Sequence, residues 1–330
     1  MIQGEALGKT DTKSRSTHPE GGGSDARLVD TFLAYLMREA PVYAKQVQET
    51  AARAPVLFHQ LAEPMLTWAS GAIGADWCET LAHGYMAIVV DVNRCQAEYT
   101  RRGRYQFSTY AEVFAQTYGD AEFMAEYHWG VYVATFAWEH HLRVYDFFMR
   151  YFVDPLSENG TGHRLLDLGC GSGIWSILAL SHLEGWDSTL VDISSATVEM
   201  TRRTLRSAGV DPRADLRQAD ALQFHEDKSF NAAISSCLLE HLEEPKRLLD
   251  NISASLGERG LAFVSAALTA AQTDHIREFR RESEVVNLAE QAGFRVVASY
   301  SSAPRKTPAD AVFLPRTMAL VLQKRAGEYW

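Results

Sequence analysis

The sequence predicts an α/β fold: a doubly wound, mostly parallel seven-stranded sheet preceded by an all-α region. Three observations carry this prediction. The first 155 residues show helical patterns without strand alternation. From residue 164 onward, short apolar runs alternate with helical patterns, as in repeated β-α-β units. A glycine-rich turn over residues 169–173 joins the first of these runs to a helix.

The length of 330 residues suggests two domains. Residues 1–25 are polar and lack apolar periodicity, so we expect a disordered tail there. Residues 26–155 are predicted to form a helical cap that holds substrate, and residues 160–330 an α/β domain. The Pro, Gly and Ser content of residues 155–161 is typical of the linker between them.

Composition excludes several classes of function. A net charge of −10 argues against a nucleic-acid partner, which would require a basic face. The cysteines form no C-x-x-C pair, so we expect reduced thiols and a cytoplasmic protein. No apolar run approaches the roughly 18 residues that a membrane span needs, and no signal peptide is expected.

The helical region contains five predicted helices. They start near residue 26, at Pro41, and near residues 76, 109 and 121, and end near residues 40, 54, 100, 118 and 152. Pro41 suits the first position of a helix because its missing N–H would have no partner there. The last of the five is predicted as one long helix.

Aromatic residues are concentrated in this last part of the helical region. Residues 105–152 hold 16 of the 35 aromatic residues of the chain. They could form a helix buried on all sides, or an aromatic wall for an apolar substrate. The candidate substrate-binding residues are Tyr127, Trp129, Tyr132 and Trp138.

The same segment contains His128, Glu139, His140 and His141. Two metal ligands on one helical face would need i, i+4 spacing, whereas His140 and His141 are adjacent and point in different directions. We therefore predict no metal site there. Glu139 and His140 stay as candidate bases.

The sequence pattern of the second half of the chain predicts seven strands and four intervening helices. The strands are 164–168, 188–192, 214–218, 230–235, 259–266, 295–299 and 317–323. The helices are 174–182, 195–208, 243–256 and 274–292. In such a sheet, ligands bind at the carboxyl ends of the strands.

The glycine-rich turn narrows the choice of ligand. Its pattern is G-x-G-x-G, with Asp167 two residues ahead of Gly169. A dinucleotide motif would need a third glycine at position 174, which is Ile174, and no Lys-Ser/Thr follows as in a phosphate loop. Glycines here reach positive φ without strain and let a ligand lie against bare backbone.

This turn resembles motif I of the class I S-adenosylmethionine-dependent methyltransferases, and the resemblance extends over residues 163–325. It implies a Rossmann-like fold that binds S-adenosylmethionine. The turn, with Gly169, Cys170, Gly171 and Gly173, would cradle the methionine part, which Asp167 would help to orient.

Residues after the next strands fit the same pattern. Asp192, followed by Ile193, would bind the ribose hydroxyls, although an acid there could also cap the next helix. Asp220 and Ala221 would bind adenine, and Ser236 closes the fourth strand near the cofactor.

The resemblance leaves the acceptor open. The loop after the fourth strand reads Ser-Ser-Cys-Leu, without the Asn/Asp-Pro-Pro-Tyr pattern of members that methylate nucleic-acid bases. With the helical cap, this favours methyl transfer to a small molecule, through oxygen, nitrogen or carbon. The alternatives are a protein methyltransferase and a protein that binds S-adenosylmethionine without transferring methyl.

A hydroxyl or carbon acceptor would also need a base. His241 and Glu240 follow the fourth strand closely and are the first candidates; His140, Glu139 and His275 are the others. A homodimer formed through exposed helical aromatic residues is compatible with the sequence.

Overall fold

Helices make up the first half of the chain in the computed structural model, which describes residues 22–114, 117, 121–305 and 314–326. They are α1 (Gly22–Glu39), α2 (Pro41–Arg53), α3 (Pro55–Ile73), α4 (Trp77–Arg102), α5 (Tyr110–Phe114), α6 (Ala121–Ala137) and α7 (Glu139–Phe148). A π-helical turn (Met149–Val153) and α8 (Asp154–Ser157) follow. Pro41 and Pro55 occupy the first positions of their helices, as the missing proline N–H allows.

Two predictions about this region need correction. Helix α1 begins at Gly22, so the last part of the predicted tail is helical; residues 1–21 lie outside the described residues. The single helix predicted over 121–152 is divided at Trp138, whose backbone is extended (φ −102°, ψ 122°). The second half of the helix predicted over 109–118 falls largely outside the described residues.

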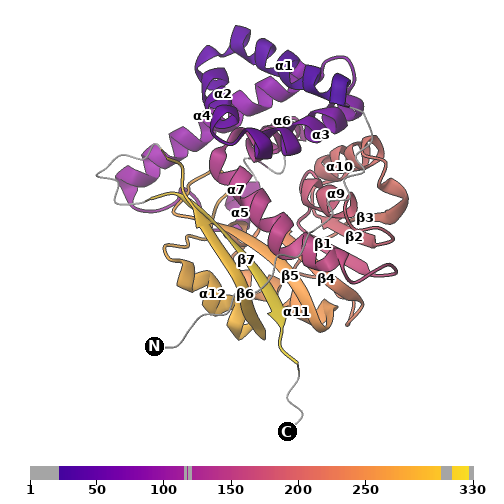
Figure 1. Cartoon of the computed structure of the whole chain (residues 1–330). Helices are drawn as coiled ribbons and strands as arrows, with labels where there is room; N and C mark the ends of the chain where they lie inside the picture. Colours follow the sequence, from indigo (N-terminus) through magenta and orange to yellow (C-terminus); the bar gives the residue numbers. More distant parts are fainter. Residues whose placement is uncertain (1–21, 115–116, 118–120, 306–313, 327–330) are drawn as a thin grey trace, which may run out of the picture.

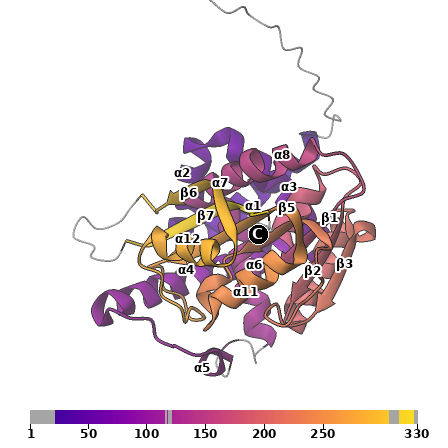
Figure 2. The same ribbon diagram turned by 90° about the horizontal axis from the view of Figure 1, so that it is seen from below.

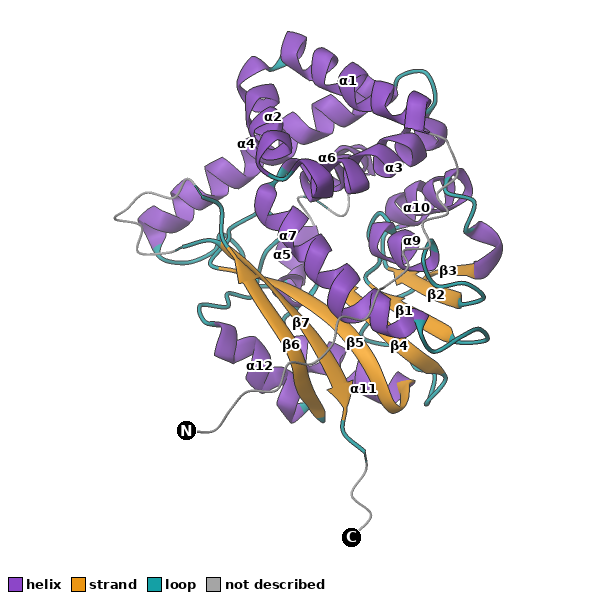
Figure 3. Cartoon of the chain, in the orientation of Figure 1, coloured by secondary structure: helices purple, strands orange, loops and turns teal. Residues whose placement is uncertain are grey.

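Seven strands form one sheet, as predicted. They are β1 (Arg164–Leu168), β2 (Asp187–Asp192), β3 (Ala214–Gln218), β4 (Phe230–Ser236), β5 (Leu256–Leu268), β6 (Phe294–Ser302) and β7 (Arg316–Lys324). Their order is β3-β2-β1-β4-β5-β7-β6. Only β7 runs antiparallel to its neighbours β5 and β6. The carboxyl ends of β1, β2 and β4 therefore lie together at one edge (Figure 3).

The pleat of β1 divides the core between the two faces of the sheet. Leu165 belongs to the core that includes α9 (Ile174–Leu180) and the helices of the first half, whereas Leu166 and Leu168 belong to the opposite core. That opposite core contains α11 (Pro245–Ser255) and α12 (Glu282–Gln291). Both faces are buried, as the continuous apolar character of the parallel strands predicts.

The helices of the first half pack on the sheet side that carries α9 and α10 (Ser195–Ser207), with α11 and α12 on the other side (Figures 1 and 2). The two halves share one hydrophobic core. At the junction the ring of Phe148 lies edge-on to Trp175 and Phe263, with centroids 5.0 and 4.8 Å away. The helical half is thereby fixed over the sheet.

The helix predicted over 274–292 is shorter in the structure, because α12 begins only at Glu282. Residues 269–281 form an irregular loop after β5. This loop is bound to α4: the side chain of Gln96 donates to the carbonyl of Thr269 (3.2 Å) and accepts from the N–H of Ala271 (2.9 Å). Its position brings three further side chains to the site described below.

Within the described ranges, no helix has both the length and the apolar character needed to cross a membrane.

Candidate active site

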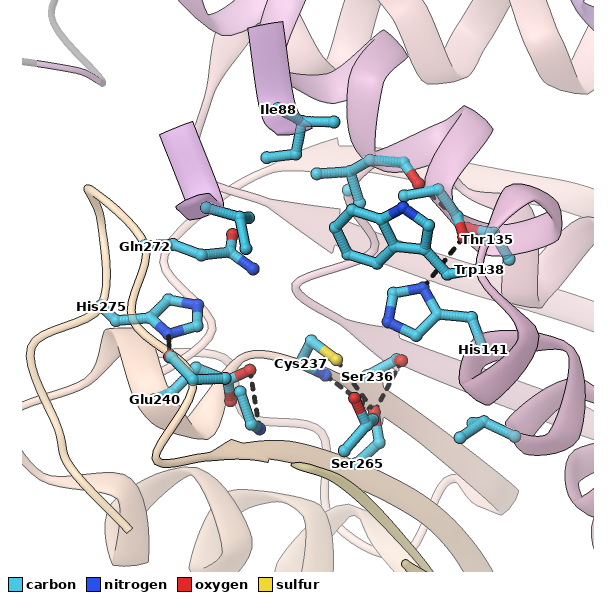
Figure 4. A pocket seen from close by; sticks show the side chains of 18 of the residues that line it. Ile88, Thr135, Trp138, His141, Ser236, Cys237, Glu240, Ser265, Gln272 and His275 are labelled. Carbon is cyan, nitrogen blue, oxygen red and sulfur yellow. Dashed lines mark hydrogen bonds between the residues drawn. The ribbon is translucent and has the colours of Figure 1, made fainter. Parts of the chain in front are cut away.

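A cavity of about 1360 Å³ lies between the helical half and the carboxyl ends of β1, β2 and β4. Figure 4 shows Trp138 and His141 on one side of it, Gln272, His275 and Glu240 on the other, and Ser236 and Cys237 between them. A single drug-sized ligand usually occupies about 300–1000 Å³. The cavity therefore has room for two ligands side by side.

The glycine-rich turn borders one end of the cavity. The backbone N–H groups of Gly169 and Cys170 both donate to the carbonyl of Val191 (2.8 and 3.1 Å), which ties the turn to β2. Gly171 has φ +52°, and no atom lies within 4 Å of where its Cβ would be. A ligand can therefore lie directly against the backbone at Gly171.

Asp192 lines the cavity at the end of β2. Its two carboxylate oxygens accept hydrogen bonds from the N–H of Gly171 (2.9 Å) and of Ser194 (3.0 Å). The side chain that caps α10 is Ser194, which accepts from the N–H of Thr197 (3.3 Å). Each oxygen of Asp192 keeps lone-pair capacity for a ligand hydroxyl.

Asp220 and Ala221 line the cavity after β3, and Ile193 lies beside Asp192. The carboxylate of Asp220 accepts from the N–H of Leu222 (2.8 Å) and from Nε2 of Gln223 (3.0 Å). These bonds fix its orientation. Tyr110 of α5, which the sequence did not single out, also lines this part of the cavity.

Asp167 and Gly173 lie beneath the turn instead of at the cavity. The carboxylate of Asp167 is buried and accepts from Oγ of Ser176 in α9 (2.6 Å). Burial raises the pKa of Asp167 to about 7. A Cβ at Gly173 would lie 2.7 Å from Thr201, so this glycine permits close packing of α9 on α10. Asp167 therefore does not line the cavity, and its expected contact with the methionine part stays a prediction.

The segment after β4 reaches the middle of the cavity. Oγ of Ser236 lies 2.8 Å from Oγ of Ser265 on β5. Cys237 has φ +52°, and its N–H donates to both the carbonyl (3.1 Å) and Oγ (3.0 Å) of Ser265. These bonds hold the turn that leads into Glu240 and His241.

Glu240 and His241 lie in a 3₁₀ turn (Leu239–His241), and both line the cavity. Oε1 of Glu240 accepts from the N–H of Ala267 (3.0 Å), and burial raises the pKa of Glu240 to about 7. Nδ1 of His241 lies 3.1 Å from the carbonyl oxygen of Asp274 and 3.4 Å from its carboxylate. The ring of His241 meets that of His275 edge-on, with centroids 4.8 Å apart.

Asp274 and Gln272 are site residues that the sequence did not indicate. The hydroxyl of Tyr127 lies 3.0 Å from Oδ1 of Asp274 and 2.7 Å from Oε1 of Gln272. Burial tends to raise the pKa of Asp274, but His241, His275 and Tyr127 hold it below its usual value. Both residues belong to the 269–281 loop; a helix was predicted from residue 274 onward, and no motif marked either residue.

The four aromatic candidates divide into two pairs. Tyr127 and Trp138 line the cavity. Trp129 and Tyr132 lie in the core, where the hydroxyl of Tyr132 donates to the carbonyl of Met65 (2.7 Å) and the two rings pack edge-on. Their assignment to substrate binding is wrong, because the α6 face that they occupy packs against α3 and α4.

Glu139 and His140, the remaining candidate bases, also line the cavity. Glu139 forms two bonds of 2.7 Å with Arg305 and lies 3.7 Å from Arg143 and 3.8 Å from Arg53. The bonds to Arg305 hold its pKa below the usual value, so it is a poor proton acceptor.

The ring of His140 stacks on Trp138, with centroids 5.6 Å apart. Burial lowers the pKa of His140 well below its usual value and that of His141 to about 4. Both rings are therefore neutral and form part of the aromatic wall.

Comparison with known proteins identifies a matching domain family. A family model described as a methyltransferase domain matches residues 138–299. The match begins at Trp138, where α6 has ended, and covers α7 and the sheet as far as β6.

Two curated relatives are named ubiquinone biosynthesis O-methyltransferase. The protein from Paraburkholderia phymatum is 30% identical over 105 residues, covering 32% of this chain and 44% of the relative. The protein from Xanthomonas axonopodis pv. citri is 24% identical over 154 residues, covering 41% of this chain and 64% of the relative. The chain thus spans about half the length of the curated relatives it matches.

Among solved structures, phosphoethanolamine N-methyltransferase 2 of Haemonchus contortus, in complex with S-adenosyl-L-methionine, matches with a TM-score of 0.51. It is 14% identical, and the match covers 67% of this chain and 61% of that one. At this identity the likeness concerns the fold.

Proposed function

We propose that this chain is an S-adenosylmethionine-dependent methyltransferase that transfers a methyl group to a small-molecule acceptor, a proposal supported by the match of residues 138–299 to a methyltransferase domain family. One observation carries the proposal. The cavity of about 1360 Å³ joins the residues expected to bind the cofactor, at Gly171, Asp192 and Asp220, to a second polar cluster at Glu240 and His241. A donor and an acceptor can meet inside it.

The residues at the first end fit the cofactor. Gly171 leaves the backbone bare, and Asp192 offers two carboxylate oxygens to neighbouring ribose hydroxyls. Asp220 and the N–H of Ala221 offer an acceptor and a donor to the adenine edge. S-adenosylmethionine, when bound, supplies an electrophilic methyl group whose bond to sulfur breaks, with the electron pair staying on sulfur.

The acceptor chamber favours a small molecule. Trp138, His140 and His141 form an aromatic wall under the helical half, and Tyr127 and Gln272 contribute polar groups opposite. A protein substrate would need an open groove for its backbone. Contacts with these side chains would align the acceptor with the methyl group, and such alignment can supply roughly 7–11 kcal/mol toward the barrier.

We further propose that the acceptor atom is a hydroxyl oxygen. The names of the two curated relatives support this choice. As a new bond forms from this oxygen to the methyl carbon, the hydroxyl proton must leave. Glu240, His241 and His275 line the cavity and are the candidate proton acceptors. Glu139 is held by Arg305 and does not take part.

Calorimetric titration with S-adenosylmethionine and S-adenosylhomocysteine tests the cofactor end. We expect both to bind to the wild-type protein. Asp192→Ala should weaken binding roughly 10- to 100-fold, the equivalent of about 1.5–3 kcal/mol for hydrogen bonds to a charged group. Asp187→Ala is the matched control, because Asp187 is exposed at the opposite end of the same strand.

The assignment would be overturned if folded wild-type protein bound neither ligand, or if Asp192→Ala and Asp187→Ala bound S-adenosylhomocysteine with equal affinity. Asp192→Asn keeps one carbonyl acceptor for the backbone N–H groups. It therefore tests the assignment even if the glycine-rich turn rearranges in Asp192→Ala. Transfer of labelled methyl should then be measured with aromatic hydroxyl compounds, aromatic amines and peptides. Uptake by peptides alone would contradict a small-molecule acceptor.

A further inference from the structure

We propose that Glu240, His241 and His275 form a binding site for a divalent transition-metal ion at the acceptor end of the cavity. One donor atom from each residue lies within 4.8 Å of the donor atoms of the other two. The residues come from two segments: the turn after β4 and the loop 269–281. This is a different group of residues from the histidines of α6 and α7.

The carboxylate of Glu240 supplies the first argument. The residue is fully buried, and Oε1 accepts from the N–H of Ala267. Oε2 is also buried and has no hydrogen-bond partner among the described residues. A buried acceptor without a partner destabilises the folded protein, and more so when the group is charged. A cation beside Oε2 would remove this cost.

The two imidazole rings are anchored as metal ligands usually are. Nδ1 of His275 lies 2.7 Å from the carbonyl oxygen of Ala270, so this nitrogen carries the proton and the lone pair is on Nε2. Nδ1 of His241 is anchored in the same way by the carbonyl of Asp274, with the carboxylate of Asp274 3.4 Å away. Metal-binding histidines typically donate their second N–H to such a carbonyl or carboxylate.

The backbone holds the two segments together before any ion binds. The carbonyl of Glu240 accepts from the N–H of Ile276 (3.0 Å) and of Arg277 (2.9 Å). His275 is therefore fixed beside the turn that carries Glu240 and His241. Metal–ligand bonds are about 2.0–2.2 Å long, so the three donor atoms must lie closer together around an ion than they do here. Rotation of the side chains can bring them closer.

The donor set indicates the class of ion. Two neutral imidazoles and one carboxylate favour zinc or another first-row transition metal, whereas magnesium prefers oxygen ligands alone. Three protein ligands leave open positions toward the cavity. The role of the ion rests on the proposed function. The ion would coordinate the acceptor hydroxyl and lower the pKa of that hydroxyl, because a divalent cation stabilises the oxyanion. The hydroxyl proton would pass to water.

Cobalt(II) titration of chelator-treated protein, followed by visible absorption and calorimetry, tests the site without cofactor or acceptor. We expect wild-type protein to bind one tight equivalent. His275→Ala and Glu240→Gln should each weaken this binding at least tenfold, as loss of one ligand requires. His225→Ala is the control, because the His225 side chain is exposed outside the cavity.

Two results would overturn the proposal: no stoichiometric cobalt or zinc binding by folded wild-type protein, or equal affinity of wild type and both site variants. Glu240→Gln keeps an acceptor for the N–H of Ala267 and so tests the site even if His275→Ala misfolds. Titration with S-adenosylhomocysteine, read separately, distinguishes failure of the metal site from failure of the proposed function.

Discussion

The function of an acidic residue near this site depends on whether its side chain lines the cavity or is buried in the core. Asp167 and Asp192 are both acids near the glycine-rich turn, yet only Asp192 lines the cavity. Asp167 is buried against Ser176. Its environment makes it a structural group that fixes α9 below the turn.

Asp167 should therefore affect stability in a pH-dependent way. Its pKa of about 7 in the folded protein exceeds the usual value of 3.8, so the folded state binds the proton more tightly than the unfolded state. Its contribution is fully present below about pH 4 and is lost as pH rises toward 7. Relative to Asp167→Asn, wild-type protein should lose about 2–3 kcal/mol of unfolding free energy between pH 5 and pH 8.

Urea denaturation of both proteins at the two pH values measures this difference. The asparagine side chain can still accept from Ser176 and does not titrate, so it is the appropriate reference. A wild-type-minus-variant difference that stays constant with pH would show that Asp167 does not hold its proton in the folded state.

Among the elements, the loop 269–281 has the greatest influence on the site, because it carries Gln272, Asp274 and His275. It is held by α4 of the helical half. The carboxylate of Asp91 accepts from the N–H of Thr273 (3.1 Å), from the Thr273 hydroxyl and from Arg94 (2.7 Å). Through this contact the helical half positions groups at the end of the sheet.

Asp91→Ala should release the loop and lower kcat about tenfold, while affinity for S-adenosylhomocysteine stays within twofold. Loss of hydrogen bonds to a charged group is worth about 1.5–3 kcal/mol, and part of this would appear as misplacement of the loop. Asp91 is a positioning residue, so the separation of kcat from cofactor affinity is the informative readout.

Asp146→Ala is the control. Asp146 also pairs with an arginine, Arg150, but as an i, i+4 pair on a helix surface, which contributes little to stability. Unchanged kcat in Asp91→Ala, or an equal fall in both variants, would contradict a positioning role for Asp91.

At the scale of the whole molecule, the helical half and one face of the sheet share a single core. Phe148 lies at their junction, fully buried between Trp175 and Phe263. Because the two halves bury the same side chains, neither keeps its packing when the other unfolds.

We expect one cooperative thermal transition in calorimetry, and Phe148→Ala should shift it as a whole. Truncation of a buried phenylalanine costs about 3–5 kcal/mol. Tyr151→Ala, at a half-exposed position on the next turn, should change stability little. Two separate transitions, only one of which moves in Phe148→Ala, would show that the halves unfold independently.

The local pattern of apolar and polar residues was sufficient to predict most strands of the sheet. The strands β1, β2 and β4 are apolar runs that end at Gly169, Asp192 and the Ser235-Ser236-Cys237 segment, and their predicted bounds agree closely with the structure. The errors fall where tertiary packing overrides local preference. Trp138 interrupts a helix that the pattern continued. Residues 274–281, predicted as helical, belong instead to a loop whose residues Thr269 and Ala271 bond with α4.

By itself, the sequence determined the fold class, the order of strands and helices along the chain, and the carboxylates at the strand ends. Each of these depends on residues close together in the chain. Tertiary structure decided which face of α6 meets the cavity, that Asp167 is buried, and that His275 lies beside Glu240 and His241. These proximities arise from packing between distant segments, and no local spacing of residues encodes them.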